Sequence, residues 1–553
     1  MNKRQWIAAL LASGLALTAS AIAATVGPKL WRHRRLRRRA PRGRNRIYAD
    51  AAHPRRYDEG LAAHCLNGIF LGEWRDKVLA FKGIPYAQQP VGSLRWKAPQ
   101  PAMADHRVFT AHHFGPSPIQ TEREQEAASF ARQSEACLHL NVWCAANRTE
   151  RKPVMVFFYG GSYAWGGSSN PIYDGHNLVA AHPDIVLVTV DYRVGLFGFI
   201  DFSQVPGSDQ FPDAPNLGLL DQIEALRWVK ANIHAFGGDP DCVPIFGESA
   251  GGGSVSILAT MPAARGLFRR VIAQSGSIAL SYSPDQCQSF TRKLLRRTGC
   301  TTMAELQALP LLKLREVLPW LALFSPFPQR NGRHMPTDLY AAYAQGDTAH
   351  VDLLIGTNTD EVRYWMQEVG GYTPFRILLP LLFRRQLQQL APDDQRRIDL
   401  YRARLTTDSL WQKSEFLTEI LFRLPALQQA EHHTKAGGRA FVYRWAFPSS
   451  IPHLGACHAV ELAYVFGNLD QTPFTGGRVD QQLADNIQQM WVNFARSGNP
   501  SLPDFSWPPY SLPLRPTLRF DRQLHIDHDP KSLARQLLTP LLKYRIGNVD
   551  WGF

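Results

Sequence analysis

Cysteine is scarce in this chain. The 553 residues include seven cysteines, and no two of them form a Cys-x-x-Cys pair, so a structural zinc site built on such pairs is not expected. Internal repeats are also absent, which argues against a fibrous repeat protein. Hydrophobic residues make up 45% and aromatic residues 11% of the chain. These ordinary globular values exclude global disorder and leave material for a large buried core.

Excess positive charge is nearly absent from most of the sequence. Residues 1–57 contain fourteen of the 61 Lys and Arg residues and only one of the 47 Asp and Glu residues. This segment therefore carries +13 of the formal net charge of +14. The rest of the chain carries +1. A nucleic-acid-binding body would need a basic face of its own, and we therefore expect no nucleic-acid partner.

The N-terminal segment divides into an apolar part and a basic part. Residues 6–27 contain no charged side chain, and residues 7–17 resemble the apolar region of a signal peptide, followed by small-residue cleavage patterns. If this segment is retained, its 22 residues are long enough to span a bilayer. We interpret residues 1–27 as a hydrophobic anchor or signal segment and residues 28–57 as an Arg-rich linker.

The charges on either side of the apolar segment predict its orientation. Ten basic residues lie between Lys29 and Arg46, against Lys3 and Arg4 on the other side. Because cationic flanks tend to remain cytoplasmic, the pattern favours membrane association through a single N-terminal segment, with the body on the cytoplasmic side. The basic residues from Arg32 to Arg46 are then candidates for contact with anionic lipid. The alternative is an exported protein with a cleaved signal peptide.

The body of the chain alternates short apolar runs with helical patterns. Apolar residues at helical spacing predict helices over residues 216–233 and 483–494. Continuous apolar strands between helices imply an α/β fold with a mostly parallel central sheet and helices on both faces, whose sites lie at the carboxyl ends of strands. Pro244 is unexpected inside a central strand because it removes a ladder donor. The expected strands are 154–158, 185–190, 243–246, 271–273, 353–355 and 441–443.

One glycine-rich motif lies where a strand is expected to turn into a helix. Gly247-Glu-Ser-Ala-Gly follows the apolar run 243–246 and precedes a helix expected over residues 254–259, the context of a G-x-S-x-G nucleophile elbow. Such a turn leaves no room for Cβ atoms at its glycines and lifts the Ser249 hydroxyl above the sheet. No Gly-Lys-Ser/Thr follows, so a phosphate-binding P-loop is not expected. A serine nucleophile also needs a base, an orienting acid and oxyanion donors.

Several longer blocks give this motif its context, because they resemble the type B carboxylesterase family, which includes the cholinesterases. The resemblance covers most of residues 58–553 and implies that this region is a carboxylesterase type B catalytic domain with the α/β-hydrolase fold. The blocks follow the family's order and lie at 80–92, 134–143, 191–199, 216–222, 236–240, 246–252 and 491–500.

The resemblance implies a triad of Ser249, Glu361 and His458. The family's Gly-x-Asn-x-Asp-Glu pattern matches the residues that end at Glu361, just past an expected strand, with Asp360 as the nearest competitor. The family's Gly-x-x-His-x-x-Glu-Leu pattern matches the residues around His458. His458 and Glu461 also have a metal-compatible spacing, but the sequence offers no third ligand.

The same resemblance assigns the backbone N–H groups of Gly161, Ser162 and Ala250 to the oxyanion hole. It implies a serine carboxylesterase in which His458 takes the proton of Ser249 during attack on an ester carbonyl, and in which water later hydrolyses the acyl-enzyme. No metal or organic cofactor is expected. Candidate pocket residues, chosen by position, are Glu248, Tyr282, Tyr364 and Trp365; the aromatic ones could equally belong to the core.

The sequence departs from the family at several positions. Ser162 replaces a common third glycine of the oxyanion loop. Pro118 stands where a cysteine would pair with Cys137, and Cys300 has no partner at the family's spacing, which suits a reducing compartment. The loop of residues 120–134, where the cholinesterases carry a choline-binding Trp, contains Phe130 as its one aromatic residue. A choline ester is therefore not the favoured substrate.

Other functions remain open at this stage. Relatives of the neuroligin type keep the fold and lose the triad, so a non-catalytic binding protein is an alternative. The presence of Ser249, Glu361 and His458 disfavours it. An amidase, a carbamate hydrolase or a thioesterase could use the same three residues, and the sequence does not separate these from an esterase for small or medium carboxylic esters.

Overall fold

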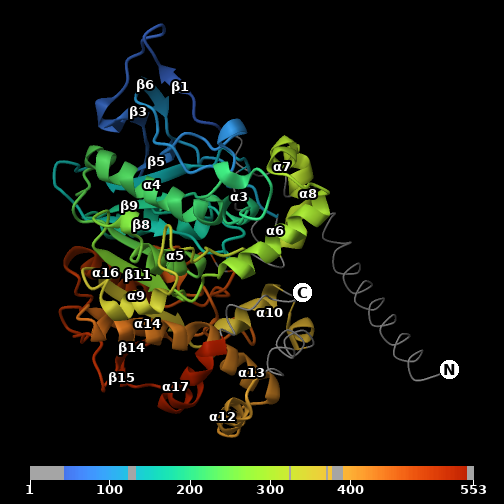
Figure 1. Ribbon diagram of the computed structural model, residues 1–553. Helices are drawn as coiled ribbons and strands as arrows, with labels where there is room; N and C mark the ends of the chain where they lie inside the picture. The colour runs from blue at the N-terminus through green and yellow to red at the C-terminus, as the bar shows by residue number, and fades with distance from the viewer. Residues whose placement is uncertain are drawn as a thin grey trace.

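The computed structural model describes residues 43–121, 132–322, 326–368, 371–376, 390–471 and 473–544. An eleven-stranded sheet runs through the centre of the molecule, in the order β15-β14-β13-β12-β11-β10-β8-β9-β7-β5-β4 (Figure 1). Neighbouring strands from β9 through β14 in this order are parallel, and antiparallel strands extend the sheet at both edges. The predicted mostly parallel sheet of an α/β fold is confirmed.

The strands agree with the apolar runs of the sequence. Every residue of β8, β9 and β10 is buried, as expected for parallel strands covered on both faces. The bounds are β4 Glu73–Arg75, β5 Val78–Pro85, β7 His139–Ala145, β8 Val154–Phe158, β9 Val186–Val190, β10 Pro244–Glu248, β11 Arg270–Gln274, β12 Asp352–Asn358, β13 Ala440–Trp445, β14 Pro516–Phe520 and β15 His525–His528.

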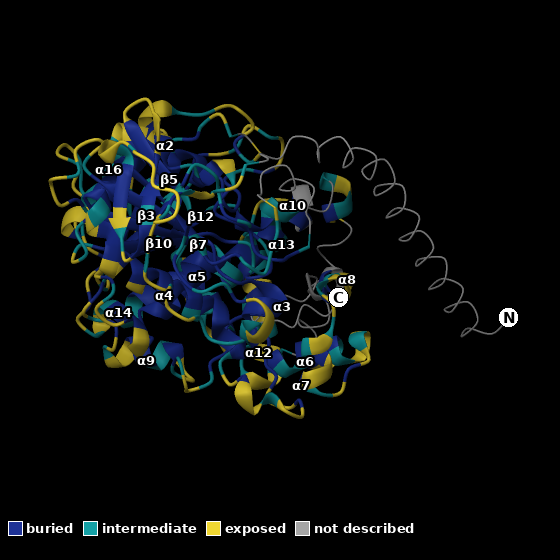
Figure 2. Cartoon of the chain, turned by 90° about the horizontal axis from the view of Figure 1, so that it is seen from above, coloured by how far each residue is buried: buried dark blue, intermediate teal, exposed yellow. Residues whose placement is uncertain are grey.

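Helices cover both faces of this sheet. Seen from above, α2 and α16 lie on one side of the strands, and α4, α5, α9 and α14 lie on the other (Figure 2). The helices are α2 His176–Ala181, α3 Gly195–Gly198, α4 Leu217–Asn232, α5 Ala250–Leu258, α6 Pro284–Thr298, α7 Met303–Ala308, α8 Leu311–Ala322, α9 Leu339–Gln345, α10 Trp365–Glu368, α12 Pro392–Arg402, α13 Ser409–Thr418, α14 Leu424–Lys435, α15 Leu462–Phe466, α16 Gln481–Ser497 and α17 Ser532–Leu538.

Pro244 is the first residue of β10, a strand in the interior of the sheet between β11 and β8. Its register with β11 begins at Arg270, whereas the register of β10 with β8 begins one residue later, at Ile245. A proline at the first position of a strand removes no interior ladder bond. The helix after the motif also begins earlier than expected, at Ala250, directly after Ser249.

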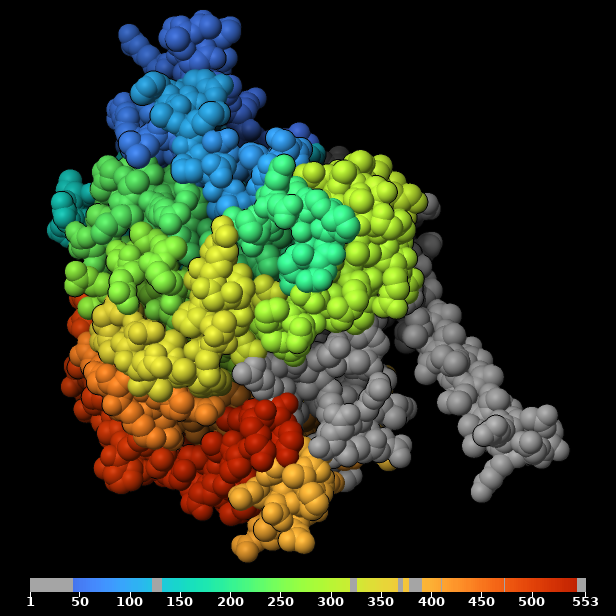
Figure 3. Space-filling view, viewed as in Figure 1, coloured from blue at the N-terminus to red at the C-terminus, as the bar shows by residue number. Residues whose placement is uncertain are grey.

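A second, four-stranded sheet lies at the N-terminal end of the molecule, opposite the elements that follow α12 (Figure 3). Its order is β1-β6-β3-β2, with β1 Ile47–Ala49, β2 Ala62–Cys65, β3 Asn67–Leu71 and β6 Asp105–Thr110. Residues 28–57 were expected to form a linker, but β1 lies within them and pairs antiparallel with β6. The linker interpretation is therefore wrong for residues 47–49, where backbone pairing with β6 outweighs the weak apolar pattern of the sequence.

The side chain of Asn45 fixes the start of β1. Its amide donates to the carbonyl oxygens of Lys82 (2.7 Å) and His113 (2.8 Å), and its oxygen accepts from the N–H groups of His112 and His113 (both 3.0 Å). One side chain thus satisfies four backbone groups of β5 and of the segment after β6. These four hydrogen bonds hold the chain in place just before β1, within the segment predicted to be a linker.

Replacing Asn45 by alanine is expected to lower the free energy of unfolding by about 1–3 kcal/mol, because partly buried backbone groups lose their partners. The measurement is the shift of the urea unfolding midpoint. The control is Asn147→Ala, since Asn147 is exposed and bonds within its own turn to Thr149. Equal stability of the two variants would contradict an anchoring role for Asn45.

The residues that the structure describes include no helix long and apolar enough to cross a membrane. The predicted anchor, residues 1–27, and most of the basic residues from Arg32 to Arg46 lie outside the described residues, as does Phe130. All seven cysteines lie within them and are free thiols, in agreement with the missing partners of Cys137 and Cys300.

Candidate active site

Ser249 occupies a sharp turn between β10 and α5. Its backbone has φ 57° and ψ −121°, its N–H donates to the carbonyl of Gln274 on β11 (2.8 Å), and its carbonyl accepts from the N–H of Gly253 (2.8 Å). A Cβ atom at Gly247 would lie 2.5 Å from the backbone of Gly251, so the turn requires glycine there. Ser249 is partly exposed although the residues on either side of it are buried, which leaves its hydroxyl within reach of a ligand.

A strained residue held by its surroundings is typical of functional sites. The φ and ψ of Ser249 lie in a region that residues with a Cβ atom rarely adopt, and bonds to β11 and α5 hold the backbone there. The strand–turn–helix context predicted for the elbow is therefore present.

His458 and Glu361 form a short contact next to this turn. Nδ1 of His458 lies 2.6 Å from Oε2 of Glu361, and both side chains are almost completely buried. The other carboxylate oxygen, Oε1, accepts from the N–H of Asn358 at 2.7 Å. Glu361 is thus fixed from two sides, and it in turn fixes the orientation of the imidazole ring.

Asp360, the competing acid, faces a different partner. Its carboxylate accepts from the N–H of Ala456 (3.0 Å) and pairs with Arg363 (3.0 Å), so it holds the loop that precedes His458. The geometry therefore favours Glu361 over Asp360 as the partner of the imidazole.

The loop after β8 lies directly against the elbow. A Cβ atom built on Gly160 would be 2.9 Å from Cβ of Ser249 and 2.7 Å from the carbonyl oxygen of Glu248. Gly161 (φ 112°) and Ser162 (φ 53°) follow in left-handed conformations, and the carbonyl of Gly161 accepts from the N–H groups of two later loop residues. The loop with Gly161 and Ser162 is thus brought beside Ser249 and Ala250, as the predicted set of oxyanion donors requires.

Aromatic rings surround the imidazole. Trp365 stacks on His458 with ring centroids 5.7 Å apart and an angle of 21°, and Tyr364 meets it edge-on at 5.6 Å. Phe422 approaches to 5.0 Å from a different segment. Two of the three aromatic residues predicted for the pocket therefore contact His458. Tyr282 has another environment: it is 2% exposed and its ring stacks on Phe290 and Phe327 in the core.

Three buried glutamates determine the electrostatics of His458. Burial disfavours charge on the imidazole, but Glu248 and Glu361 outweigh it and raise the pKa of His458 to about 9. Burial raises the pKa of Glu248 to about 8 and also raises the pKa of Glu461. A proton on Glu248 removes one of the charges that favour the imidazolium, so protonation of Glu248 lowers the pKa of His458.

Glu248 is the glutamate nearest to the second ring nitrogen. Its Oε1 lies 3.1 Å from Nε2 of His458 and makes no hydrogen bond within the described part of the chain. Nε2 is therefore not committed to a hydrogen bond with Glu248, although the charge of that carboxylate acts on it at close range.

Replacing Glu248 by glutamine is expected to lower the pKa of His458, because it removes the nearest carboxylate from Nε2. A base must be neutral to accept a proton, so the acid limb of kcat/KM should move to lower pH, by about one unit. The measurement is the pH profile of ester hydrolysis. Glu224→Gln, a buried glutamate of α4, is the control; an unmoved or raised limb in Glu248→Gln would contradict the assignment.

Sequence reasoning missed several residues of this site. Asn358 links the acid to Glu461, because its side chain donates to Glu461 Oε2 at 2.6 Å while its N–H donates to Glu361. Gln274 donates to the other oxygen of Glu461 at 3.1 Å. The asparagine of the Gly-x-Asn-x-Asp-Glu pattern was a usable signal for Asn358, whereas nothing in the sequence marks Phe422.

The described residues contain no group of three or more His, Cys, Asp or Glu side chains placed to hold a metal ion. His458 and Glu461 instead have the partners given above. Cys457 is buried beside His458, and burial raises the pKa of its thiol.

Comparisons with known proteins show the family to which the chain belongs. The family model described as "Carboxylesterase family" matches residues 65–539. The para-nitrobenzyl esterase of Bacillus subtilis is 36% identical over 86% of this chain and 97% of its own, and the acetylcholinesterase of Bungarus fasciatus is 30% identical over 81% and 80%. A solved carboxylesterase of Geobacillus stearothermophilus superimposes with a TM-score of 0.77 at 33% identity, covering 86% of this chain and 99% of that one. The chain therefore belongs to the carboxylesterase family and is a carboxylic ester hydrolase with the α/β-hydrolase fold.

Proposed function

We propose that Ser249 is the nucleophile of this esterase, His458 its general base and Glu361 the acid that orients the base. The observation that supports this most directly is the 2.6 Å contact between His458 Nδ1 and Glu361, next to the turn that carries the partly exposed Ser249. With Nδ1–H donated to Glu361, Nε2 is left to accept the proton of Ser249. Glu361 then stabilises the imidazolium that forms.

The reaction proceeds in two steps. Ser249 attacks the ester carbonyl, and the oxyanion accepts hydrogen bonds from the backbone N–H groups of Gly161, Ser162 and Ala250. His458 returns the proton to the leaving alcohol, and a water molecule activated by the same base then hydrolyses the acyl-enzyme. Losing one oxyanion donor costs about 2.7–4 kcal/mol of transition-state stabilisation in enzymes of this kind.

The substrates are small or medium carboxylic esters, and the surroundings of His458 favour an aromatic or bulky apolar group. Three rings, those of Tyr364, Trp365 and Phe422, lie within 5.7 Å of the imidazole centroid. The name of one relative, para-nitrobenzyl esterase, also points to a benzyl-type ester as a test substrate. A choline ester is disfavoured because residues 120–134 contain no Trp.

Two measurements test this function together. The full chain is assayed with p-nitrophenyl esters of increasing acyl length and is labelled with a fluorophosphonate, and the labelled residue is identified by mass spectrometry. We expect turnover and labelling of Ser249 alone. A folded protein that neither turns over nor takes the label would favour the non-catalytic binding alternative. Faster release of p-nitroaniline from the matched anilides or carbamates than of p-nitrophenol would favour the amidase or carbamate hydrolase alternative.

For the N-terminal region we propose that residues 1–27 anchor the protein in a membrane. The catalytic domain, residues 58–553, would lie on the cytoplasmic side, and the basic residues from Arg32 to Arg46 would contact anionic lipid. The charge asymmetry about residues 6–27 supports this orientation, and export with a cleaved signal peptide is the alternative. Mass spectrometry of the protein from its native membrane fraction separates the two: an intact N-terminus supports the anchor, and a mature end near residues 20–24 supports export.

A further inference from the structure

A π-helical turn lies between α13 and α14. Residues Glu419–Arg423 form this turn, which continues the helical path from Thr418 to Leu424. Such turns are rare, and they often mark functional positions because the extra residue changes which side chains face a neighbouring element. Here the turn packs against β12, whose carboxyl end leads to Glu361.

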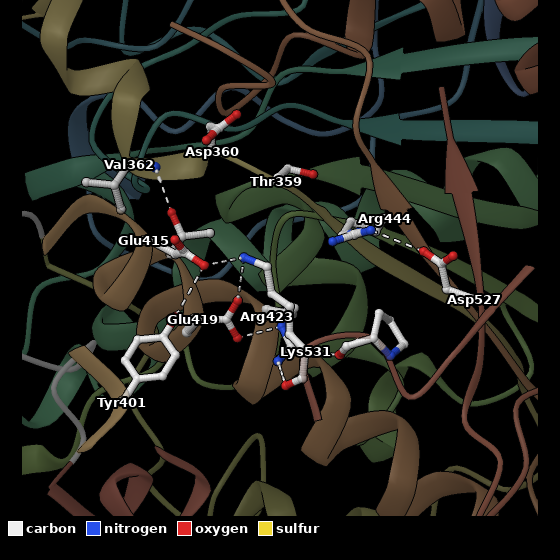
Figure 4. A network of polar contacts seen from close by, with 12 residues as sticks. Thr359, Asp360, Val362, Tyr401, Glu415, Glu419, Arg423, Arg444, Asp527 and Lys531 are labelled. Atoms are coloured by element: carbon white, nitrogen blue, oxygen red, sulfur yellow. Dashed lines mark hydrogen bonds and ion pairs between the residues drawn. The ribbon is translucent and has the colours of Figure 1, made fainter. Parts of the chain in front are cut away.

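A cluster of charged side chains around the buried Glu419 holds this turn in place. Glu419 has a fully buried carboxylate that lies 2.5 Å from Nε of Arg423 and 3.2 Å from Nζ of Lys531, as Figure 4 shows. Arg423 also donates to the carbonyl oxygens of Pro530 (3.2 Å) and Lys531 (3.3 Å), and Lys531 pairs with Glu415 (3.0 Å). The cluster therefore joins the π turn to the loop before α17.

The cost of burying these charges is met by their mutual pairing. Burial alone would raise the pKa of Glu419, but Arg423 and Lys531 outweigh it and hold that pKa below its usual range. Removing Arg423 would leave the buried carboxylate of Glu419 with Lys531 as its one remaining cationic partner in the described part of the chain, which is unfavourable. The turn is thus held by interactions with Lys531 and the loop before α17, none of which involves a residue of the triad.

Thr418, directly before the turn, and Phe422, within it, contact the surroundings of Glu361 and the ring of His458. Thr418 Oγ1 accepts from the N–H of Val362, the residue directly after Glu361, at 3.4 Å. Phe422, one residue before Arg423, packs on the ring of His458 at 5.0 Å and on Trp365 at 6.1 Å. Each of these residues is the direct sequence neighbour of a member of the ion cluster: Thr418 precedes Glu419, and Phe422 precedes Arg423.

We propose that Arg423 is a positioning residue of this esterase, which acts through the π turn to hold Phe422 against His458. The proposal rests on the function proposed above. If the cluster is loosened, the ring of Phe422 moves away from the imidazole of His458. Water then reaches the imidazole, so the ring of His458 is held less firmly and its charged form is better hydrated. The chemical step then slows, and the imidazolium becomes easier to form.

The groups that face His458 set the sign of the pH effect. These are Glu248 from β10, Glu361 after β12, Glu461 before α15 and the phenol-bearing ring of Tyr364. None of them is changed by a substitution at position 423. Relief of burial therefore raises the pKa of His458, and the acid limb of kcat/KM moves to higher pH.

The test is a double-mutant cycle on the full chain with p-nitrophenyl butyrate. Arg423→Met is expected to lower kcat about tenfold and to move the acid limb upward by about half a unit, with KM changed less than kcat. Phe422→Leu is expected to act in the same direction. The double variant should be no worse than Phe422→Leu, because Arg423 acts through that ring. Arg423→Lys keeps the charge and should restore most of kcat.

Controls separate positioning from simple stability. Arg535 pairs with Asp529 (2.6 Å) near the same loop, and Arg535→Met should lower the melting temperature without moving the acid limb. A wild-type acid limb and kcat in Arg423→Met, or independent effects in the double variant, would overturn the proposal. If Arg423→Met does not fold, the same cycle with Lys531→Met, which removes the other cation paired with Glu419, decides, with a shift of the same sign expected. If the wild-type protein neither hydrolyses the ester nor is labelled at Ser249, the proposed function itself is overturned.

Discussion

Replacing Ser249 by alanine is expected to reduce kcat for ester hydrolysis by about 10⁵–10⁶-fold, to the level that binding and the oxyanion donors alone provide. The substitution removes one oxygen atom from a partly exposed side chain and leaves the Cβ atom and the bonds of the turn in place. The fold should therefore be retained. The measurements are kcat with p-nitrophenyl butyrate, far-UV circular dichroism and fluorophosphonate labelling.

Ser254 provides the matched control for this variant. It lies further along α5, is fully buried, and accepts a hydrogen bond from Gln222 at 3.1 Å. Ser254→Ala is expected to retain both labelling and turnover, with a small loss of stability. If Ser249→Ala kept more than about 1% of the wild-type kcat, or if the label remained, another residue would be the nucleophile.

The fold could be predicted from the sequence because parallel strands buried on both faces give unbroken apolar runs. The run over residues 154–158 coincides with β8, and the helical spacing over residues 216–233 agrees with α4 to within one residue at each end. Strand β1 was missed because its three residues carry no such pattern, and the pairing with β6 and the four bonds of Asn45 depend on residues far along the chain.

The candidate site could be predicted to the extent that its chemistry lies in short segments. Each of the three triad candidates, Ser249, Glu361 and His458, lies within a recognisable motif. The structure brings Glu361 and His458 together although they are 97 positions apart in the sequence. The side chains that surround His458 were predicted less well. Tyr364 and Trp365 follow Glu361 closely in sequence, so their position near the base could be anticipated.

Phe422 could not be anticipated in the same way. Its contact with His458 depends on a π turn, which no simple hydrophobic period reveals, and on a salt-bridge cluster that includes Lys531, more than one hundred residues further on. For Tyr282 the sequence left a pocket position and a core position equally open. The structure favours the core, because its ring stacks on Phe290 and Phe327, which come from segments that sequence alone did not place beside it.

Replacing Glu361 by glutamine is expected to lower kcat by about 10⁴-fold, through the tautomer of His458 rather than through a loss of fold. Oε1 of Glu361 accepts from the N–H of Asn358, and Oε2 faces Nδ1 of His458. An amide at this position keeps its oxygen toward the Asn358 N–H and turns its NH₂ toward Nδ1. The NH₂ group donates to Nδ1, so the ring proton moves to Nε2, which can then no longer accept the proton of Ser249.

Asp360→Asn is the matched control, because it makes the same chemical change one residue earlier. Asp360 accepts from the N–H of Ala456 and pairs with Arg363, and an amide oxygen can still accept the first of these bonds. We therefore expect kcat within about tenfold of the wild type and some loss of stability from the weakened ion pair. Labelling of Ser249 should slow in Glu361→Gln and not in Asp360→Asn, since phosphonylation needs the same base. The reverse order of the two variants would identify Asp360 as the functional acid and would mean that the 2.6 Å contact between Glu361 and His458 does not orient the base.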